Sequence, residues 1–226
     1  MQCVILAAGK GTRLRPLTDN IPKPLVEVCG KPLIDHIASA LPSAVNEIIM
    51  VIGYRGEMIK EYCGDIFHGR PVKYIEQTEI NGPATALWLT KDLIKGRFLF
   101  MFADDIHGKD DLARAVSFSR SILATTSANP ERFGVIVRNP DGTIAEMVEK
   151  PSSPSSNLVA TGPMVLDQKI FEFPPEAPIK DEYFMPEIIM RYKESYPIAV
   201  VEENLWLAIG YPEDIATAEK KLCPVA

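Results

Sequence analysis

The first half of the chain alternates continuous apolar runs with stretches of helical periodicity. Val4-Ile5-Leu6, residues 48–52 and residues 98–102 are apolar runs of strand length, which is typical of parallel strands buried on both faces. Between them, apolar side chains at positions 33, 34, 37 and 41 share one helical face, and residues 84–94 form a second amphipathic stretch. This order predicts an α/β fold with a Rossmann-like, open, mostly parallel sheet, helices on both faces, and ligands beyond the carboxyl ends of the strands.

The second half follows a different pattern. Residues 134–138, an Asn-Pro-Asp-Gly turn and residues 143–148 predict a β-hairpin subdomain over the active-site crevice. Another strand is expected over residues 158–166, and a helix opens at Pro212 with acidic residues in its first turn. The Ser/Pro segment 151–156 is too short for a linker. We therefore expect a single catalytic domain over residues 1–226, without internal repeats and without a C-terminal β-helix domain.

Composition narrows the function classes. The formal net charge of −6 gives no overall basic field, which argues against nucleic acid as the main partner. No apolar stretch approaches the roughly 20 residues of a membrane-spanning helix, and the N-terminus lacks a basic segment of the secretory type. We expect a cytoplasmic protein without a membrane partner, and the assembly state, a homo-oligomer included, stays open.

Cysteines and histidines show no metal-binding spacing. The four cysteines, at positions 3, 29, 63 and 223, form no C-x-x-C pair, and we expect them to be reduced thiols. His36, His68 and His107 share no spacing suited to zinc, and each is expected on the surface or in a loop.

A glycine-rich basic loop follows the first predicted strand. Gly9 and Gly11 allow backbone N–H groups to approach an anion without an intervening Cβ. Lys10, Arg13, Arg15 and Lys23 then concentrate positive charge in an otherwise acidic chain. The spacing is neither that of a P-loop nor that of a dinucleotide fingerprint, and glycines alone would also fit a tight β-to-α turn. The cation density favours a triphosphate-binding loop.

From this loop onward the sequence resembles the sugar-phosphate nucleotidyltransferase family. Residues 6–18 and Pro22-Lys23-Pro24-Leu25 match its signature L-A-A-G-x-G-T-R-L-x-P-L-T…P-K-P-L almost letter for letter. Further matches follow in family order along nearly the whole chain, among them Asp104, Glu149-Lys150-Pro151 and Trp206. The resemblance implies a Rossmann-like nucleotide-binding sheet, a Mg²⁺ requirement, and transfer of a nucleotidyl group to a sugar 1-phosphate with release of pyrophosphate.

The resemblance also assigns roles by matched position. The catalytic residues would be Arg13 on the leaving pyrophosphate, Lys23 at the α-phosphate and Asp104 as the Mg²⁺ ligand. The nucleotide would be bound by Leu6, Ala8, Gly9, Gly11, Thr12, Arg13, Gln77 and Gly82, and the sugar phosphate by Gly134, Glu149, Lys150, Thr161 and Trp206. The segment from Gln77 to Gly82 matches one that reads a pyrimidine base, which implies UTP or dTTP without deciding between them.

One position departs from the family pattern. The second metal carboxylate normally stands in W-x-D, but this chain has Trp206-Leu207-Ala208, and a methyl group cannot coordinate a cation. Either Asp104 and the phosphates hold the metal, or another carboxylate substitutes, or catalysis is weakened. A hexose 1-phosphate such as glucose 1-phosphate is the expected acceptor. The alternatives are a cytidylyltransferase acting on phosphocholine, which would need an aromatic or acidic cage, and a nucleotide-binding regulatory module.

Overall fold

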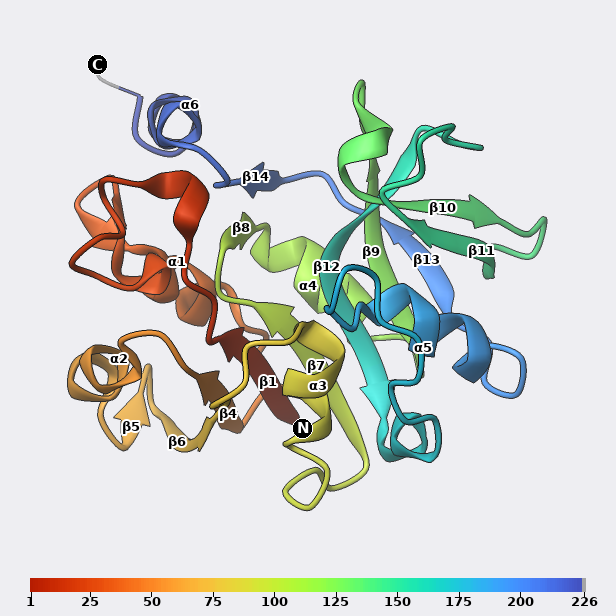
Figure 1. The fold of residues 1–226 in the computed structure, drawn as a ribbon, viewed down its shortest axis with the longest axis horizontal. Helices are drawn as coiled ribbons and strands as arrows, with labels where there is room; N and C mark the ends of the chain where they lie inside the picture. The colour runs from red at the N-terminus through yellow and green to blue at the C-terminus, as the bar shows by residue number, and fades with distance from the viewer. Residues whose placement is uncertain (225–226) are drawn as a thin grey trace.

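The computed structural model describes residues 1–224 and is built on one large mixed sheet (Figure 1). Its main path runs β11-β10-β12-β7-β1-β4-β6-β5, and β9 and β13 extend it from β12. The central strands β7, β1, β4 and β6 pair in parallel, whereas β12 runs antiparallel to β7 and β9. The predicted Rossmann-like parallel sheet is confirmed at the centre, with an antiparallel extension on one side.

The strands are β1 (Gln2–Ala7), β2 (Glu27–Val28), β3 (Lys31–Pro32), β4 (Glu47–Ile52), β5 (Ile66–Phe67), β6 (Arg70–Glu76), β7 (Arg97–Phe102), β8 (Asp105–His107), β9 (Ser121–Thr126), β10 (Gly134–Arg138), β11 (Ile144–Glu149), β12 (Leu158–Asp167), β13 (Ala199–Glu202) and β14 (Trp206–Ala208). The α-helices are α1 (Leu33–Ala40), α2 (Gly56–Cys63), α3 (Pro83–Trp88), α4 (Lys109–Ala115), α5 (Met185–Tyr192) and α6 (Pro212–Leu222). Short 3₁₀ turns are η1 (Thr12–Leu14), η2 (Lys23–Leu25), η3 (Pro130–Arg132) and η4 (Gln168–Glu172).

Strand β1 is buried on both faces and separates two apolar layers. Val4 and Leu6 pack with residues of α3 and α5, while Cys3, Ile5 and Ala7 pack with residues of α1, α2 and α4. This split follows from the alternation of side chains along a strand. Helices on both faces are why the central strands read as continuous apolar runs.

The second half forms the predicted hairpin, with one helix shorter than expected. Strands β10 and β11 pair antiparallel around the turn at residues 139–142, and Figure 1 shows them projecting from the sheet beside α5. The helix expected over residues 84–94 ends at Trp88. The Thr90 hydroxyl donates to the carbonyl of Leu87 at 2.7 Å, and the Thr90 backbone N–H bonds the same carbonyl at 2.9 Å. These i to i−3 contacts replace the helical ladder beyond α3.

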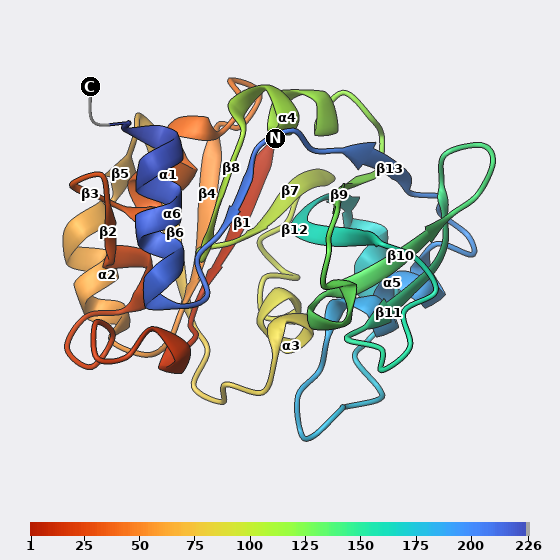
Figure 2. The same ribbon diagram turned by 90° about the horizontal axis from the view of Figure 1, so that it is seen from above.

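The C-terminal helix α6 packs beside the N-terminal elements, as both ribbon views show (Figure 2). Ala218 of α6 joins a third apolar cluster with Val28 and Leu33. No helix within residues 1–224 combines the length and the apolar character that a membrane crossing requires.

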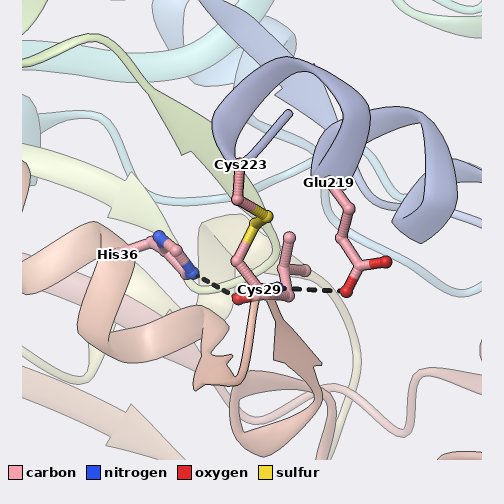
Figure 3. Close-up of a disulfide and its surroundings, with 5 residues drawn as sticks. Cys29, His36, Glu219 and Cys223 are labelled. Carbon is pink, nitrogen blue, oxygen red and sulfur yellow. Dashed lines mark hydrogen bonds between the residues drawn. A yellow bond between two sulfur atoms is a disulfide. The ribbon is translucent and has the colours of Figure 1, made fainter. Parts of the chain in front are cut away.

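A disulfide fixes the end of α6 and corrects one expectation from the sequence. Cys29 and Cys223, expected as reduced thiols, form a disulfide with a Cα–Cα distance of 6.3 Å (Figure 3). Cys3 and Cys63 are free and buried. In Figure 3 the Cys29 backbone N–H also donates to Glu219 of α6, at 3.1 Å. The two bonded cysteines are 194 residues apart in sequence, so the packing of α6 against β2 brings them within bonding reach.

Candidate active site

Two adjoining hollows open at the carboxyl ends of β1 and β7, with volumes of about 520 Å³ and 420 Å³. These volumes suit small-molecule ligands. All the residues predicted to bind the nucleotide line the first hollow, namely Leu6, Ala8, Gly9, Gly11, Thr12, Arg13, Gln77 and Gly82. All those predicted to bind the sugar phosphate line the second, namely Gly134, Glu149, Lys150, Thr161 and Trp206. The three predicted catalytic residues, Arg13, Lys23 and Asp104, line both hollows.

The glycine-rich loop needs its second glycine for the backbone. Gly11 has φ 60°, a left-handed conformation, and a Cβ on it would lie 3.0 Å from the Cβ of Lys23. Gly9 faces open space, since a Cβ on it would have no contact within 4 Å among residues 1–224 beyond its chain neighbours. Protein contacts therefore explain Gly11, whereas the room beside Gly9 is open to a ligand at the end of β1.

Lys23 and Asp104 form an ion pair where the two hollows meet. The Lys23 Nζ lies 3.2 Å from Asp104 Oδ2. The Lys23 side chain is only 10% exposed, while that of Asp104 is 41% exposed. The lysine is thus held rigidly in the wall, and the Asp104 carboxylate still faces the hollows and is accessible to a ligand.

Asp105 is a partly buried neighbour of the site whose contacts could not be predicted from the sequence. It accepts hydrogen bonds from Trp206 Nε1 at 2.9 Å and from the Ile209 N–H at 3.1 Å. Burial, with the adjacent charge of Asp104 as a second cause, raises the pKa of Asp105 to about 6. Each carboxylate oxygen accepts one hydrogen bond, from Trp206 or from Ile209, so Asp105 orients Trp206 while it also lines the second hollow. Its position beside Asp104 in the sequence was the only signal of this role.

Gln77 and Gly82 form one wall of the first hollow. Gln77 is buried, and its Nε2 donates to the Gly82 carbonyl at 3.2 Å and to the Thr85 hydroxyl at 3.3 Å. Gly82 has φ 113°, and a Cβ there would collide with the Tyr183 carbonyl oxygen. The Gln77 amide is therefore fixed through its donor group, and its oxygen is the group left to accept from a ligand.

The second hollow contains an unpartnered hydroxyl and a charged pair. Thr161 Oγ1 is buried and has no hydrogen-bond partner among residues 1–224, which is costly unless a ligand supplies one. Lys150 Nζ lies 2.9 Å from Glu149 Oε1. A side chain at Gly134 would come within 3.5 Å of the Glu149 carboxylate. These groups together offer acceptors and donors for sugar hydroxyls and a phosphate.

Trp206 contributes only its ring to this hollow. Its indole N–H is taken up by Asp105, and the ring makes an edge contact with Phe133 at 5.1 Å between centroids. Because its N–H is already donated to Asp105, Trp206 can contact a sugar only by packing its ring against it.

Two residues that line the second hollow, Arg132 and Tyr211, were not predicted from the sequence, and the location expected for His107 was wrong. Arg132 and Tyr211 line the second hollow, and the one available signal was that Arg132 is a cation just before the matched Gly134. His107 was expected on the surface or in a loop, but it is buried at the end of β8, and its Nδ1 lies 2.7 Å from Glu203 Oε1. Glu203 is 96 residues away in sequence, so a local pattern could not reveal the pair.

Comparison with known proteins gives a family model and relatives that match nearly the whole chain. Residues 2–224 match the family model described as nucleotidyl transferase. The chain is 37% identical over 235 residues to the UTP–glucose-1-phosphate uridylyltransferase AglF of Haloferax volcanii, covering 98% of this chain and 96% of that protein. It is 35% identical over 226 residues to the bifunctional protein GlmU of Methanocaldococcus jannaschii, covering 98% of this chain. The chain spans about half, 54%, of that GlmU protein.

Solved structures show the same fold. A putative glucose-1-phosphate thymidylyltransferase from Bacillus anthracis superposes with a TM-score of 0.88 at 25% identity, covering 100% of this chain and 96% of that one. A UDP-glucose pyrophosphorylase superposes with a TM-score of 0.82 at 23% identity and 97% coverage of each chain. The second likeness bears on the fold alone.

Proposed function

Because the chain belongs to the nucleotidyl transferase family, we propose that it transfers a nucleotidyl group from UTP or dTTP to a hexose 1-phosphate, with glucose 1-phosphate as the first candidate. The observation that carries the proposal is that Arg13, Lys23 and Asp104 line both of two adjoining hollows. A reaction between two phosphate-bearing substrates needs charged groups at the place where they meet.

The reaction is a direct displacement at phosphorus. An oxygen of the sugar phosphate attacks the α-phosphate, a new P–O bond forms, the bond between the α-phosphate and its bridging oxygen breaks, and pyrophosphate leaves with that oxygen. Lys23 would stabilise charge at the α-phosphate, and Arg13 would stabilise the leaving pyrophosphate. No covalent intermediate with the protein is required, because binding aligns the attacking oxygen and the α-phosphate.

The fixed amide of Gln77 supports a uracil or thymine base. Its Nε2 is used by Gly82 and Thr85, which leaves the amide oxygen as an acceptor. Uracil and thymine carry a donor at N3, whereas cytosine carries an acceptor there, so the fixed oxygen favours the first two. Because UTP and dTTP share this N3 donor, both nucleotides stay in the proposal.

The residues present fit Mg²⁺ with a single side-chain ligand. Asp104 faces the hollows, Asp105 is engaged with β14, and Ala208 has no donor atom. Within residues 1–224 no cluster of three His, Cys, Asp or Glu side chains is suited to a metal. Mg²⁺ commonly binds one or two carboxylates together with substrate phosphates and waters, so Asp104 would hold it with the triphosphate. When bound, it supplies charge neutralisation at the phosphates.

The rival acceptor, phosphocholine, fits less well. A quaternary amine is recognised by free aromatic faces. In the second hollow Arg13 and Arg132 lie over the Tyr211 ring and Lys150 lies over the Phe184 ring, at 5.3 to 5.5 Å from the centroids. These rings already carry the cations of the protein, whose positive charge would repel a quaternary amine.

The proposal is tested by pyrophosphate release with a panel of substrates. The folded protein with Mg²⁺ is given UTP, dTTP, CTP, GTP or ATP together with each of several hexose 1-phosphates or with phosphocholine, and products are identified by mass spectrometry. We expect turnover with UTP or dTTP, and little with CTP. If no pair of substrates gives pyrophosphate release, the proposal is contradicted. Tight nucleotide binding by calorimetry without product would instead favour a regulatory module, the second candidate, which Ala208 motivates.

A cytoplasmic location belongs to the proposal as well. Disulfides such as Cys29–Cys223 are rare in reducing cytosol outside hyperthermophiles. The oxidation state of this cysteine pair can be measured by alkylating free thiols in intact cells. Free thiols at both positions would support a reducing cytoplasm, and a disulfide would argue against it. The assembly state can be measured on the same purified protein by light scattering.

A further inference from the structure

Two arginines line the second hollow without a protein partner for their charge. Within residues 1–224, neither Arg13 nor Arg132 forms an ion pair or a side-chain hydrogen bond. Lys23 and Lys150, in the same hollow, are instead paired with Asp104 and Glu149. Two unpaired guanidinium groups close together raise the local positive potential, and an anion bound between them would relieve it.

Both guanidinium groups are gathered on one aromatic ring. The Cζ atoms of Arg13 and Arg132 each lie 5.5 Å from the centroid of the Tyr211 ring. The backbone N–H groups of Tyr211 and Gly210 donate to Asp214 Oδ2 at 2.7 and 2.8 Å. Asp214 belongs to the first turn of α6, so the start of this helix fixes the ring and the ring gathers the two cations.

The two arginines reach the hollows from different sides. Arg13 comes from the glycine-rich loop and lines both hollows. Arg132 ends η3, just before β10, and lines only the second hollow, as do Glu149 and Lys150. Arg13 can therefore contact a ligand in the nucleotide hollow, whereas Arg132 can contact only a ligand in the second hollow.

We propose that Arg132 binds the phosphate of the sugar 1-phosphate, and that Tyr211 is a positioning residue that holds Arg13 and Arg132 at neighbouring phosphates. The assignment rests on the proposed function, since it names the acceptor phosphate of that reaction. The planar guanidinium offers two parallel N–H donors to phosphate oxygens, which a lysine cannot reproduce.

Arg132→Gln and Arg132→Lys test the binding role. We expect both variants to raise the KM for glucose 1-phosphate, the glutamine variant by about 10- to 100-fold, as for the loss of a charged hydrogen-bonded contact. The KM for UTP should change by less than about twofold, because Arg132 does not line the first hollow. Arg138→Gln is the matched control: it removes an arginine from the end of β10, the strand that follows η3, where it is paired with Glu202 and lies outside both hollows, and it should leave both KM values unchanged.

Tyr211→Leu and Tyr211→Phe test the positioning role. Leucine removes the aromatic face and should raise the KM for both substrates, whereas phenylalanine keeps the ring and should restore both values to near wild type. The phenylalanine variant and thermal melts of all variants separate loss of positioning from loss of folding. Equal KM values in the leucine and phenylalanine variants overturn the role of Tyr211.

Direct binding separates this inference from the proposed function. Calorimetry with each hexose 1-phosphate of the panel is done on the wild type and on Arg132→Gln, without turnover. If no pair of substrates reacts, the proposed function fails, but weaker sugar-phosphate binding by the variant would still support Arg132. An unchanged Kd in Arg132→Gln, or no sugar-phosphate binding by the wild type, overturns the assignment.

Discussion

Ala208 lies directly opposite Asp105 in the antiparallel pairing of β14 with β8. Side chains opposite each other in such a pair have Cβ atoms about 4.5–5.5 Å apart, and Ala208 also lines the second hollow with Asp104. We predict that Ala208→Asp adds a metal carboxylate, so that half-maximal activity is reached at a lower Mg²⁺ concentration and the rate rises. The measurement is a Mg²⁺ titration of the initial rate at saturating substrates.

The new carboxylate should also affect stability. In EDTA, Ala208→Asp should melt below the wild type because it stands beside Asp104 and Asp105, and Mg²⁺ should recover part of the difference. Ala208→Asn has nearly the same size without the charge and serves as the control. An unchanged rate and Mg²⁺ dependence in the aspartate variant would mean that the site never needed a second carboxylate.

At the scale of single residues, the sequence predicted the lining of the hollows where glycine or polar residues directly follow buried strands. Gly9 follows β1 and Asp104 follows β7, and the ends of adjacent parallel strands meet at one edge of the sheet. Tyr211 and Arg132 could not be predicted in the same way. They come from segments far apart in sequence, and their joint contact with Arg13 depends on the docking of α6 and η3 around the hollow.

At the scale of elements, the segment before β14 is held by a buried carboxylate of α4. Asp111 accepts hydrogen bonds from the Leu205 N–H at 2.9 Å and the Asn204 N–H at 3.2 Å, and pairs with Arg114. Burial by itself would raise the pKa of Asp111, but the N–H donors of Leu205 and Asn204 and the Arg114 guanidinium outweigh it and hold the pKa below its ordinary value of 3.8.

We predict that Asp111→Asn lowers the free energy of unfolding by about 2 kcal/mol at pH 7, because an NH₂ group then faces N–H donors. A depressed pKa contributes stability above the unfolded value of 3.8, and this contribution is lost as pH falls through the folded value. The difference between variant and wild type should therefore shrink as pH falls below about 4. Urea unfolding at pH 7 and at pH 3 measures it.

Asp110→Asn is the control for the Asp111→Asn variant. Asp110 also lies in the first turn of α4 but is exposed, so its substitution should cost less than about 1 kcal/mol, the range of a helix-terminus charge. A loss in Asp111→Asn that is equally large at pH 3 and pH 7 would contradict the electrostatic explanation.

Helices and strands could be predicted best where the pattern of apolar residues along the chain was strong. The apolar runs predicted β1, β4 and β7 to within a few residues, and the Asn-Pro-Asp-Gly turn predicted the hairpin. The helix over residues 84–94 was overestimated, because amphipathic spacing continues past Trp88 while the Thr90 hydroxyl competes for a backbone carbonyl. Hydrogen-bond competition of this kind does not change the apolar pattern.

At the scale of the whole molecule, the two ends of the chain are joined in a way that local patterns cannot reveal. Cys29 follows β2 and Cys223 follows α6. Cysteine spacing indicates metal sites or redox motifs only when the partners are near in sequence. The apolar contact of α6 with β2 places the two thiols side by side.

The disulfide should stabilise the fold without being part of the reaction. We predict that Cys29→Ser, Cys223→Ser and the double variant each lose the same 2–4 kcal/mol or so of unfolding free energy, since any one of them removes the bond. The KM values should change by less than about twofold, because Tyr211 lies at the other end of α6 and is held by Asp214. Alkylation of the unfolded wild type without reductant should label only Cys3 and Cys63. Additive losses from the two single variants, or labelling of all four cysteines, would show that Cys29 and Cys223 are not bonded.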